Sequence, residues 1–374
     1  MILLFITILL FIIYSILIVY YWQGWLKMPE YNLVENESLQ TKVSIIIPAR
    51  NEEGNIGRLL QSLQRQTYPK ALTEIIVVND HSTDGTANVV NQFSNVQLVS
   101  FTNELINSYK KKAIETGIAA ANGELIITTD ADCIAGENWL YTIVSFYKKN
   151  DSAFIAAPVT FTENVSNKLL YYFQVLDFLT LQGITGVSVY KKMLSMSNGA
   201  NLAYRKDIFY QVNGFNDIDN IASGDDMLLM HKIKTAHPDQ VHYIKSKEAI
   251  VQTAAANSWN EFFNQRIRWA SKANKYDDKR IFFVLLLVYL FNLSFLVLLI
   301  AGFFNHQLWL YLAILWLAKT IIEFPFVYSV ASFFNRRSLM KYFFFFQPLH
   351  IAYTIIAGWL GQFGSYEWKG RKVK

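Results

Sequence analysis

The feature that most constrains this chain is an almost uninterrupted apolar segment over residues 1–22, which ends in Tyr20, Tyr21 and Trp22. As a helix, such a segment spans about 30 Å of hydrocarbon, with aromatic side chains at one membrane interface. It has no charged start, its apolar core is too long for a secretory signal, and no small-residue cleavage site follows it. We therefore predict an N-terminal membrane anchor and not a cleaved signal peptide.

A second apolar region follows Arg280, and short polar connections divide it into three segments, at residues 281–304, 308–329 and 342–363. We predict a C-terminal membrane region over residues 281–363, followed by a basic tail over residues 364–374. The last segment contains Gln347-Pro348-Leu349-His350, which can break a helix. It is therefore expected to be either a third span or a re-entrant or interfacial segment.

Three short runs between these apolar ends are rich in β-branched residues, at positions 43–47, 74–78 and 124–129. A polar motif and then a stretch of helical character follow each run. Alternation of short apolar strands with helices predicts a mostly parallel sheet, in which ligands bind beyond the carboxyl ends of the strands. The polar motifs are therefore expected to meet at one edge of the sheet.

Acidic residues follow two of these strands. Asp130-Ala131-Asp132 closes the third run, and Asp80 follows the second. Paired carboxylates at a strand end suit Mg²⁺ or Mn²⁺, ions that usually complete their shell with water and the phosphates of a nucleotide. An isolated D-x-D is explained equally well by helix capping or by solvation in a loop.

Five motifs in order resemble those of membrane-embedded family 2 glycosyltransferases. They are Ile47–Glu53 (IPARNEE), Val78–Thr86 (VNDHSTDGT), the D-x-D, Gly224-Asp225-Asp226 and Gln265-Arg266-Ile267-Arg268-Trp269. The resemblance covers residues 40–275 and implies an inverting enzyme. It also implies an α/β fold of the GT-A type, a mostly parallel sheet flanked by helices. One N-terminal and two to three C-terminal transmembrane helices complete the predicted architecture.

The resemblance assigns the nucleotide-sugar donor to seven positions and the metal to two. The donor residues are Pro48, Ala49, Arg50, Glu52, Asp80, Lys112 and Asp130, and the metal ligands are Asp130 and Asp132. Asp80 is expected to accept hydrogen bonds from the ribose or base, with Asn79 where the family often has a second acid. Lys112 matches a donor-contacting lysine of the family, although a solvated charge run explains Lys110–Lys112 equally well. Asp84 is expected to cap the next helix.

The resemblance also implies the catalytic groups. Asp226 is assigned as the general base that takes the proton of the acceptor hydroxyl, with helix capping as the alternative. Gln265, Arg268 and Trp269 share one face of a predicted helix, and we expect Arg266 to face another way. Arg268 would neutralise the departing diphosphate, and Trp269 would stack on a sugar ring. Without the other motifs, the same residues would be interpreted as membrane-interface anchors.

The resemblance places an acceptor-binding loop at Asn198-Gly199-Ala200, where a tight turn entering a strand is the alternative. The aromatic segment at residues 169–179 is expected either to lie along the membrane surface and steer a lipid-linked acceptor, or to be a buried helix covering the sheet.

Composition excludes other classes. The net charge is only +5, and no dense Lys/Arg tract accompanies stacking aromatics, so nucleic-acid binding has little support. The one cysteine, Cys133, excludes an internal disulfide and fits a reducing compartment.

We expect residues 27–280 in the cytosol, at the cell inner or plasma membrane, because the Arg336-Arg337 loop and the supply of nucleotide sugars agree with this side. A re-entrant last segment would keep the basic tail cytosolic.

We therefore predict an inverting, metal-dependent glycosyltransferase with a UDP-linked donor and a lipid-linked acceptor at the cytosolic membrane face. A processive polysaccharide synthase is the alternative, because the Gln-x-x-Arg-Trp motif also resembles those enzymes. The apolar segments carry few polar residues from which to line a polymer channel, beyond Asn292, Lys319, Glu323 and His350. A non-catalytic scaffold or export subunit is a hypothesis of another class, and the intact acids argue against it.

Overall fold

The computed structural model describes most of the chain, namely residues 2–33, 39–100, 108–163, 167–219, 224–271, 278–363, 366–368 and 371–373. It divides into two compact units. Unit 1 holds residues 1–28, 163–187 and 255–374, and unit 2 holds residues 29–162 and 188–254.

Unit 2 is built on a sheet of seven described strands in the order β3-β2-β1-β4-β8-β6-β9. The strands are β1 (Val43–Ala49), β2 (Thr73–Asn79), β3 (Val96–Ser100), β4 (Leu125–Thr128), β6 (Phe154–Ala156), β8 (Leu202–Arg205) and β9 (Val241–Tyr243). Strands β1 to β4 run parallel, while β8 is antiparallel to both of its neighbours. The expected mostly parallel sheet is confirmed.

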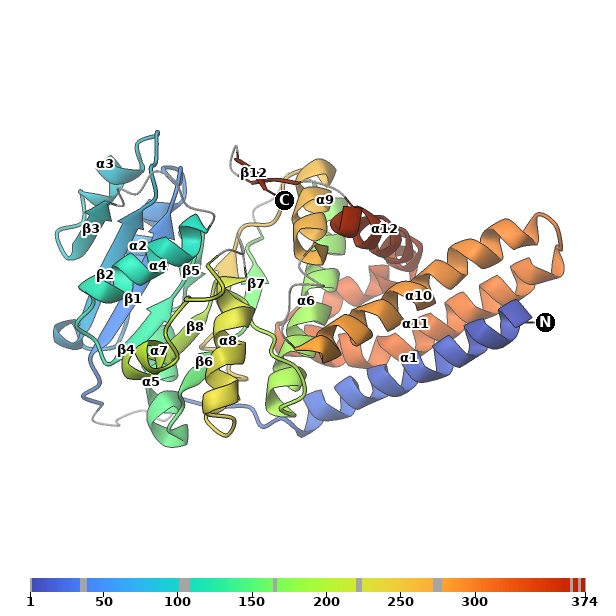
Figure 1. Cartoon of the computed structure of the whole chain (residues 1–374), viewed down its shortest axis with the longest axis horizontal. Helices are drawn as coiled ribbons and strands as arrows, with labels where there is room; N and C mark the ends of the chain where they lie inside the picture. The colour runs from blue at the N-terminus through green and yellow to red at the C-terminus, as the bar shows by residue number, and fades with distance from the viewer. Residues whose placement is uncertain are drawn as a thin grey trace. The chain divides into compact units, whose positions relative to one another are not determined.

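Helices and a small second sheet complete unit 2 (Figure 1). The helices are α2 (Ile56–Gln64), α3 (Thr86–Val90), α4 (Tyr109–Ala120), α5 (Trp139–Asn150), α7 (Lys206–Gln211) and α8 (Asp225–Ala236). The second sheet pairs β5 (Ile134–Ala135), β10 (Val251–Thr253) and β7 (Val159–Phe161). A short 3-10 helix, η1 (Lys70–Leu72), precedes β2.

The buried core of unit 2 explains why these segments form strands. Ile45, Ile46 and Ile47 of β1 are fully buried, as are the central residues of β2 and β4. Helix α4 lies so close to this sheet that a Cβ on Gly117 would meet the Ile46 side chain at 2.5 Å. Only glycine therefore allows α4 to seat against β1 at this depth.

Unit 1 contains the long apolar helices. They are α1 (Ile2–Lys27), α10 (Lys279–Gly302), α11 (Gln307–Phe333) and α12 (Phe343–Phe363), and η2 (Arg337–Tyr342) precedes the last. Among the described residues, four helices are long and apolar enough to cross a membrane. Helices α1, α10 and α11 run side by side, whereas α12 is foreshortened in the view of Figure 1 and packs on α9 (Trp259–Ala270) and α10.

The structure differs from two of the expectations drawn from the sequence. The predicted break at Gln347–His350 is wrong, because α12 continues through Pro348 as one helix. The units also differ from the predicted domain over residues 40–275, since α6 (Lys168–Tyr190) and α9 fall largely in unit 1. The aromatic face of α6 explains the difference, because Phe173 packs against Phe262 of α9 and Tyr353 of α12. The helix therefore packs on α9 and α12.

The chain ends in a small antiparallel pair, β11 (Tyr366–Trp368) and β12 (Arg371–Val373), within the predicted tail.

Candidate active site

The loops after β1 and β2 are held together by side chains from both. The parallel register pairs Ala49 with Asn79, so the two strands end side by side. Asn51 Oδ1 accepts a hydrogen bond from the Thr83 amide at 2.8 Å, and Asp84 Oδ2 accepts one from the Glu53 amide at 3.1 Å. These cross-loop bonds make the edge of the sheet a defined surface.

Asp80 lies at this edge of the sheet, directly after β2. Its side chain is buried, and the Arg50 guanidinium lies 3.8 Å from Asp80 Oδ1 and donates to the Asp80 carbonyl at 3.0 Å. The His81 ring lies 3.0 Å from the same carboxylate oxygen. The adjacent strand ends therefore bring together two predicted donor residues, Arg50 and Asp80.

Asp84 helps to fix the loop. Its Oδ1 accepts from the Thr86 amide at 3.0 Å, at the first residue of α3, while the cap residue proper is Gly85. The expected contact at the start of this helix is present, but the Asp84 carboxylate also ties the two loops to each other.

One lysine forms ion pairs with acids from two motifs. Lys110 Nζ, from the first turn of α4, lies 2.7 Å from Asp130 Oδ1 and 3.3 Å from Asp225 Oδ2. Burial by itself would lower the pKa of Lys110, but Asp130 and Asp225 raise it well above its ordinary value. The ammonium group therefore remains charged and neutralises part of an acidic cluster.

Asp132 lies deeper than Asp130. Its Oδ2 accepts a hydrogen bond from the Thr253 hydroxyl at 3.0 Å, on β10. Burial, and then the charges of Asp130 and Glu52, raise the pKa of Asp132 to about 6. Mutual repulsion among these carboxylates favours a cation at this place.

The donor set fits a divalent ion of the Mg²⁺ type. Within the described ranges, no three His, Cys, Asp or Glu side chains converge into a ready-made metal cage. Two carboxylates on neighbouring strand-end positions suit an ion that keeps several waters and binds substrate phosphates. Asp130 and Asp132 would hold the ion, because an ion of this type prefers oxygen ligands to a thiol such as that of the buried Cys133.

The start of α8 meets the loop before β8. Gly224 adopts a left-handed φ of +80°, which turns the chain into the helix. Asp226 Oδ2 then accepts a hydrogen bond from the Gly199 amide at 3.1 Å. A Cβ on Gly199 would lie 3.1 Å from both Asp225 Oδ2 and Lys110 Nζ, so the loop backbone passes directly over the acidic cluster.

The predicted acceptor loop has a compact internal structure as well. Asn198 Oδ1 accepts from the Ala200 amide at 3.0 Å, which is the turn that the alternative interpretation expected. The turn is therefore present and brings Gly199 against Asp226, while the acceptor-binding role stays a prediction.

Lys112 does not join this cluster in the structure. Its Nζ pairs with Glu115 Oε2 at 3.1 Å on α4 itself, and its side chain is 43% exposed. Residues two apart on a helix face different directions, and Lys110 is the one that faces the acids. The resemblance points to Lys112 because an alanine follows it. An alanine at the next position does not determine which side of the helix faces the acids.

The Gln-x-x-Arg-Trp motif lies on α9, in unit 1. Ser258 caps this helix by accepting from the Glu261 amide at 3.2 Å. Phe262 and Arg266 are its buried residues, while Gln265, Arg268 and Trp269 are partly exposed. Arg266 is buried where these three are partly exposed, but its guanidinium contacts both Gln265 and Trp269. The expectation that it points away from them is therefore wrong.

Comparison with known proteins identifies the fold and shows which family model part of the chain matches. The model of "Glycosyl transferase family 2" matches residues 44–212. The solved structure of the mannosyltransferase PcManGT from Pyrobaculum calidifontis, in complex with GDP-Man and Mn²⁺, superposes with a TM-score of 0.57 at 20% identity and covers 96% of this chain and 98% of that chain. The likeness confirms the GT-A-like architecture.

Two curated relatives match about two thirds of the chain. "Probable glycosyltransferase YdaM" of Bacillus subtilis (strain 168) is 28% identical over 247 residues, 65% of this chain and 57% of the relative. A poly-beta-1,6-N-acetyl-D-glucosamine synthase of Staphylococcus epidermidis is 24% identical over 242 residues, 64% of this chain and 56% of the relative. The chain thus spans a little more than half the length of these relatives. Residues 44–212 are similar to glycosyl transferase family 2, and the sheet that they build is GT-A-like.

Proposed function

We propose that this protein is an inverting, metal-dependent glycosyltransferase that moves a sugar from a UDP-linked donor to a lipid-linked acceptor at the cytosolic face of a membrane. One observation carries the proposal most. Lys110, Asp130, Asp225 and Gly199 meet at the carboxyl edge of the sheet, within a family 2 domain. Ligands of open α/β sheets bind at this edge.

The strand-end residues supply the donor site. Asp80 offers a buried carboxylate to the ribose or base, and Arg50, which follows β1, braces it. Pro48 and Ala49 at the end of β1 complete the proposed donor contacts. The negative charge of Glu52 also acts on Asp132 and helps to raise the pKa of its carboxyl group. Lys110 takes the place of Lys112 as the lysine that faces the donor phosphates, because its ammonium group lies against Asp130.

Asp130 and Asp132 are the proposed metal ligands. Bound Mg²⁺ or Mn²⁺ would screen the charge of the donor diphosphate and stabilise it as a leaving group. The side chains perform the remaining work. Thr253 orients Asp132 through its hydroxyl, and Lys110 holds the Asp130 carboxylate.

Asp226 is the proposed general base. Its Oδ2 lies against the Gly199 amide, in the loop proposed to bind the acceptor through Asn198, Gly199 and Ala200. A carboxylate within hydrogen-bond reach of the acceptor hydroxyl can take its proton as the oxygen attacks the anomeric carbon. Arg268 and Trp269, with Gln265, are assigned to the departing diphosphate and the acceptor sugar.

The polar residues of the apolar helices favour a lipid-linked acceptor over a polymer channel. Lys319 Nζ lies 2.7 Å from both Glu323 Oε1 and Gln347 Oε1, and the Tyr14 hydroxyl donates to Glu323. Lys319 is fully buried. These groups satisfy one another, which leaves fewer polar atoms to line a path for a glycan.

A processive synthase is the second candidate. It is favoured by the match to the poly-beta-1,6-N-acetyl-D-glucosamine synthase. Its product would differ in size and solubility from a glycosylated lipid, so one experiment separates the two.

The test incubates the purified full-length protein in lipid nanodiscs with Mn²⁺ and a panel of radiolabelled nucleotide sugars. We expect label from one UDP-sugar to enter a small product that organic solvent extracts. A high-molecular-weight product that stays in the aqueous phase and yields to an endoglycosidase would replace single transfer by processive synthesis. Absence of product with every donor would leave the scaffold hypothesis.

A further inference from the structure

Arg266 is the member of the α9 motif that the fold buries most. Its side chain is 3% exposed, as is that of Asp177 on α6. Arg266 Nη2 and Nε donate to Asp177 Oδ2 at 2.6 and 2.9 Å. Charge-assisted bonds between a guanidinium and a carboxylate are short and directional. The pair therefore sets how α9 is rotated against α6.

The same guanidinium touches two residues of the motif. Arg266 Nη1 donates to Gln265 Oε1 at 2.7 Å, and Arg266 Cζ lies 4.3 Å from the centre of the Trp269 ring. A planar guanidinium can stack on an aromatic face while it donates in its own plane. Its position therefore fixes Gln265 and Trp269 at once.

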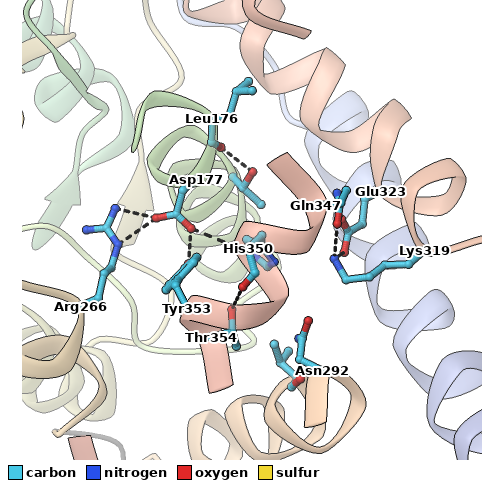
Figure 2. A network of polar contacts seen from close by, with 12 residues as sticks. Leu176, Asp177, Arg266, Asn292, Lys319, Glu323, Gln347, His350, Tyr353 and Thr354 are labelled. Carbon is cyan, nitrogen blue, oxygen red and sulfur yellow. Dashed lines mark hydrogen bonds and ion pairs between the residues drawn. The ribbon is translucent and has the colours of Figure 1, made fainter. Parts of the chain in front are cut away.

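Asp177 is itself held from the opposite side. The Tyr353 hydroxyl of α12 donates to Asp177 Oδ1, and His350 Nε2 lies 4.0 Å from the same oxygen. Figure 2 shows Asp177 between Arg266 on one side and Tyr353 and His350 on the other. One carboxylate thus joins α6, α9 and α12.

We propose that Asp177 is a positioning residue of the transferase site, which holds Arg266 and through it orients Gln265 and Trp269. This inference rests on the proposed glycosyltransferase function. A pair kept for stability alone can be replaced by apolar residues of similar volume, often without loss of stability. Orientation of Trp269 and Gln265, in contrast, requires the guanidinium itself.

Three changes separate these two roles. Asp177→Asn removes the charge, Arg266→Lys keeps the charge but loses the planar fork, and the double change Asp177→Leu with Arg266→Met replaces the pair by apolar groups. We expect each to lower kcat roughly tenfold or more, since misplaced reacting groups are costly. The KM for the nucleotide sugar should change less than kcat, because most of its proposed contacts lie at the strand ends of unit 2.

The double change is the decisive one. We expect its melting temperature to recover towards that of the unchanged protein while kcat stays low. Recovery of kcat together with the melting temperature would show a purely structural pair and overturn the proposal. If the double variant does not fold, Arg266→Lys decides, because full activity in that variant has the same meaning.

A readout independent of turnover keeps the two proposals distinguishable. The chain has nine tryptophans, so labelling with 5-fluorotryptophan gives a tractable ¹⁹F spectrum, in which the Trp269 line is the one lost in Trp269→Phe. We expect this line to shift or broaden in Asp177→Asn and Arg266→Lys. An unchanged line in both variants would contradict the positioning role. If the unchanged protein turns over no donor, the proposed function fails, and the ¹⁹F line alone decides whether Asp177 holds Trp269.

Glu323→Gln is the matched control. Glu323 belongs to another buried ion pair of the same unit, with Lys319, and the structure records no contact between it and the α9 motif. We expect this change to lower the melting temperature while the Trp269 line and kcat stay close to their original values. Equal loss of kcat in the control would assign the effects to general destabilisation.

Discussion

At the scale of single residues, Lys110 organises the acids of the proposed site. It reaches Asp130 of the D-x-D and Asp225 of the Gly-Asp-Asp motif, which lie 95 positions apart in the chain (225 minus 130). Without a cation between them, these carboxylates would repel one another. The lysine therefore stabilises an arrangement that the bound metal and diphosphate would later share.

Replacement of either D-x-D acid should abolish metal-dependent donor binding. In Asp130→Ala or Asp132→Ala, a diphosphate would face the remaining acids without a bridging ion, and we expect no saturable UDP binding by calorimetry with Mn²⁺. Glu115→Ala, which removes an acid paired with Lys112, is the control and should bind UDP normally. Unchanged affinity in both D-x-D variants would remove the metal assignment.

The two lysines of α4 give a matched pair. Lys110→Met should lower turnover roughly tenfold or more, on the scale of one charged hydrogen bond. Lys112→Met should leave it unchanged, because Lys112 pairs with Glu115 at the surface. Initial rates at saturating donor measure both. A larger loss of turnover in Lys112→Met than in Lys110→Met would instead assign Lys112 as the lysine that contacts the donor.

At the scale of elements, the loop before β8 matters because its backbone lies against the start of α8. Gly199 donates its amide to Asp226, and no side chain separates it from Asp225. This close approach requires glycine for space and not for a left-handed backbone.

Gly199→Ala should therefore impair catalysis without unfolding the chain. Its Cβ would lie 3.1 Å from Asp225 Oδ2 and from Lys110 Nζ, so the acidic cluster must shift. We expect lower turnover at a melting temperature close to the original. Gly136→Ala is the control, because its Cβ would meet nothing within 4 Å. Normal turnover in Gly199→Ala would show that the loop tolerates a side chain and place the acceptor elsewhere.

The sequence predicts much of this arrangement because strand order and the acids at strand ends are local features. The runs at residues 43–47 and 74–78 lie within β1 and β2, and the parallel sheet follows from their alternation with helices. Which of the two lysines, Lys110 or Lys112, faces the acids is not a local feature of the sequence, because it depends on how α4 packs against Ile46. Arg266 was likewise missed, because its partner Asp177 is 89 positions away.

At the scale of the whole molecule, the chain combines a strand-based unit with a unit of apolar helices. The pattern of hydrophobic segments predicts these helices, but it does not predict that α6 and α9 leave the continuous domain expected over residues 40–275. Their aromatic contacts with α12 decide this, and such contacts join residues far apart in sequence. The four long apolar helices among the described residues agree with a membrane protein.

We propose Asp226 as the base of a glycosyl transfer reaction at the edge of this sheet, and a comparison of two proteins tests this role. UDP binding with Mn²⁺ and transfer of radiolabelled sugar are measured side by side for the unchanged protein and for Asp226→Asn. We predict nearly equal UDP affinity and a turnover lower by roughly 10²-fold or more, the usual scale for removal of a general base. Equal turnover in the two proteins would contradict the account and move the base elsewhere, with Asp225 as the next candidate.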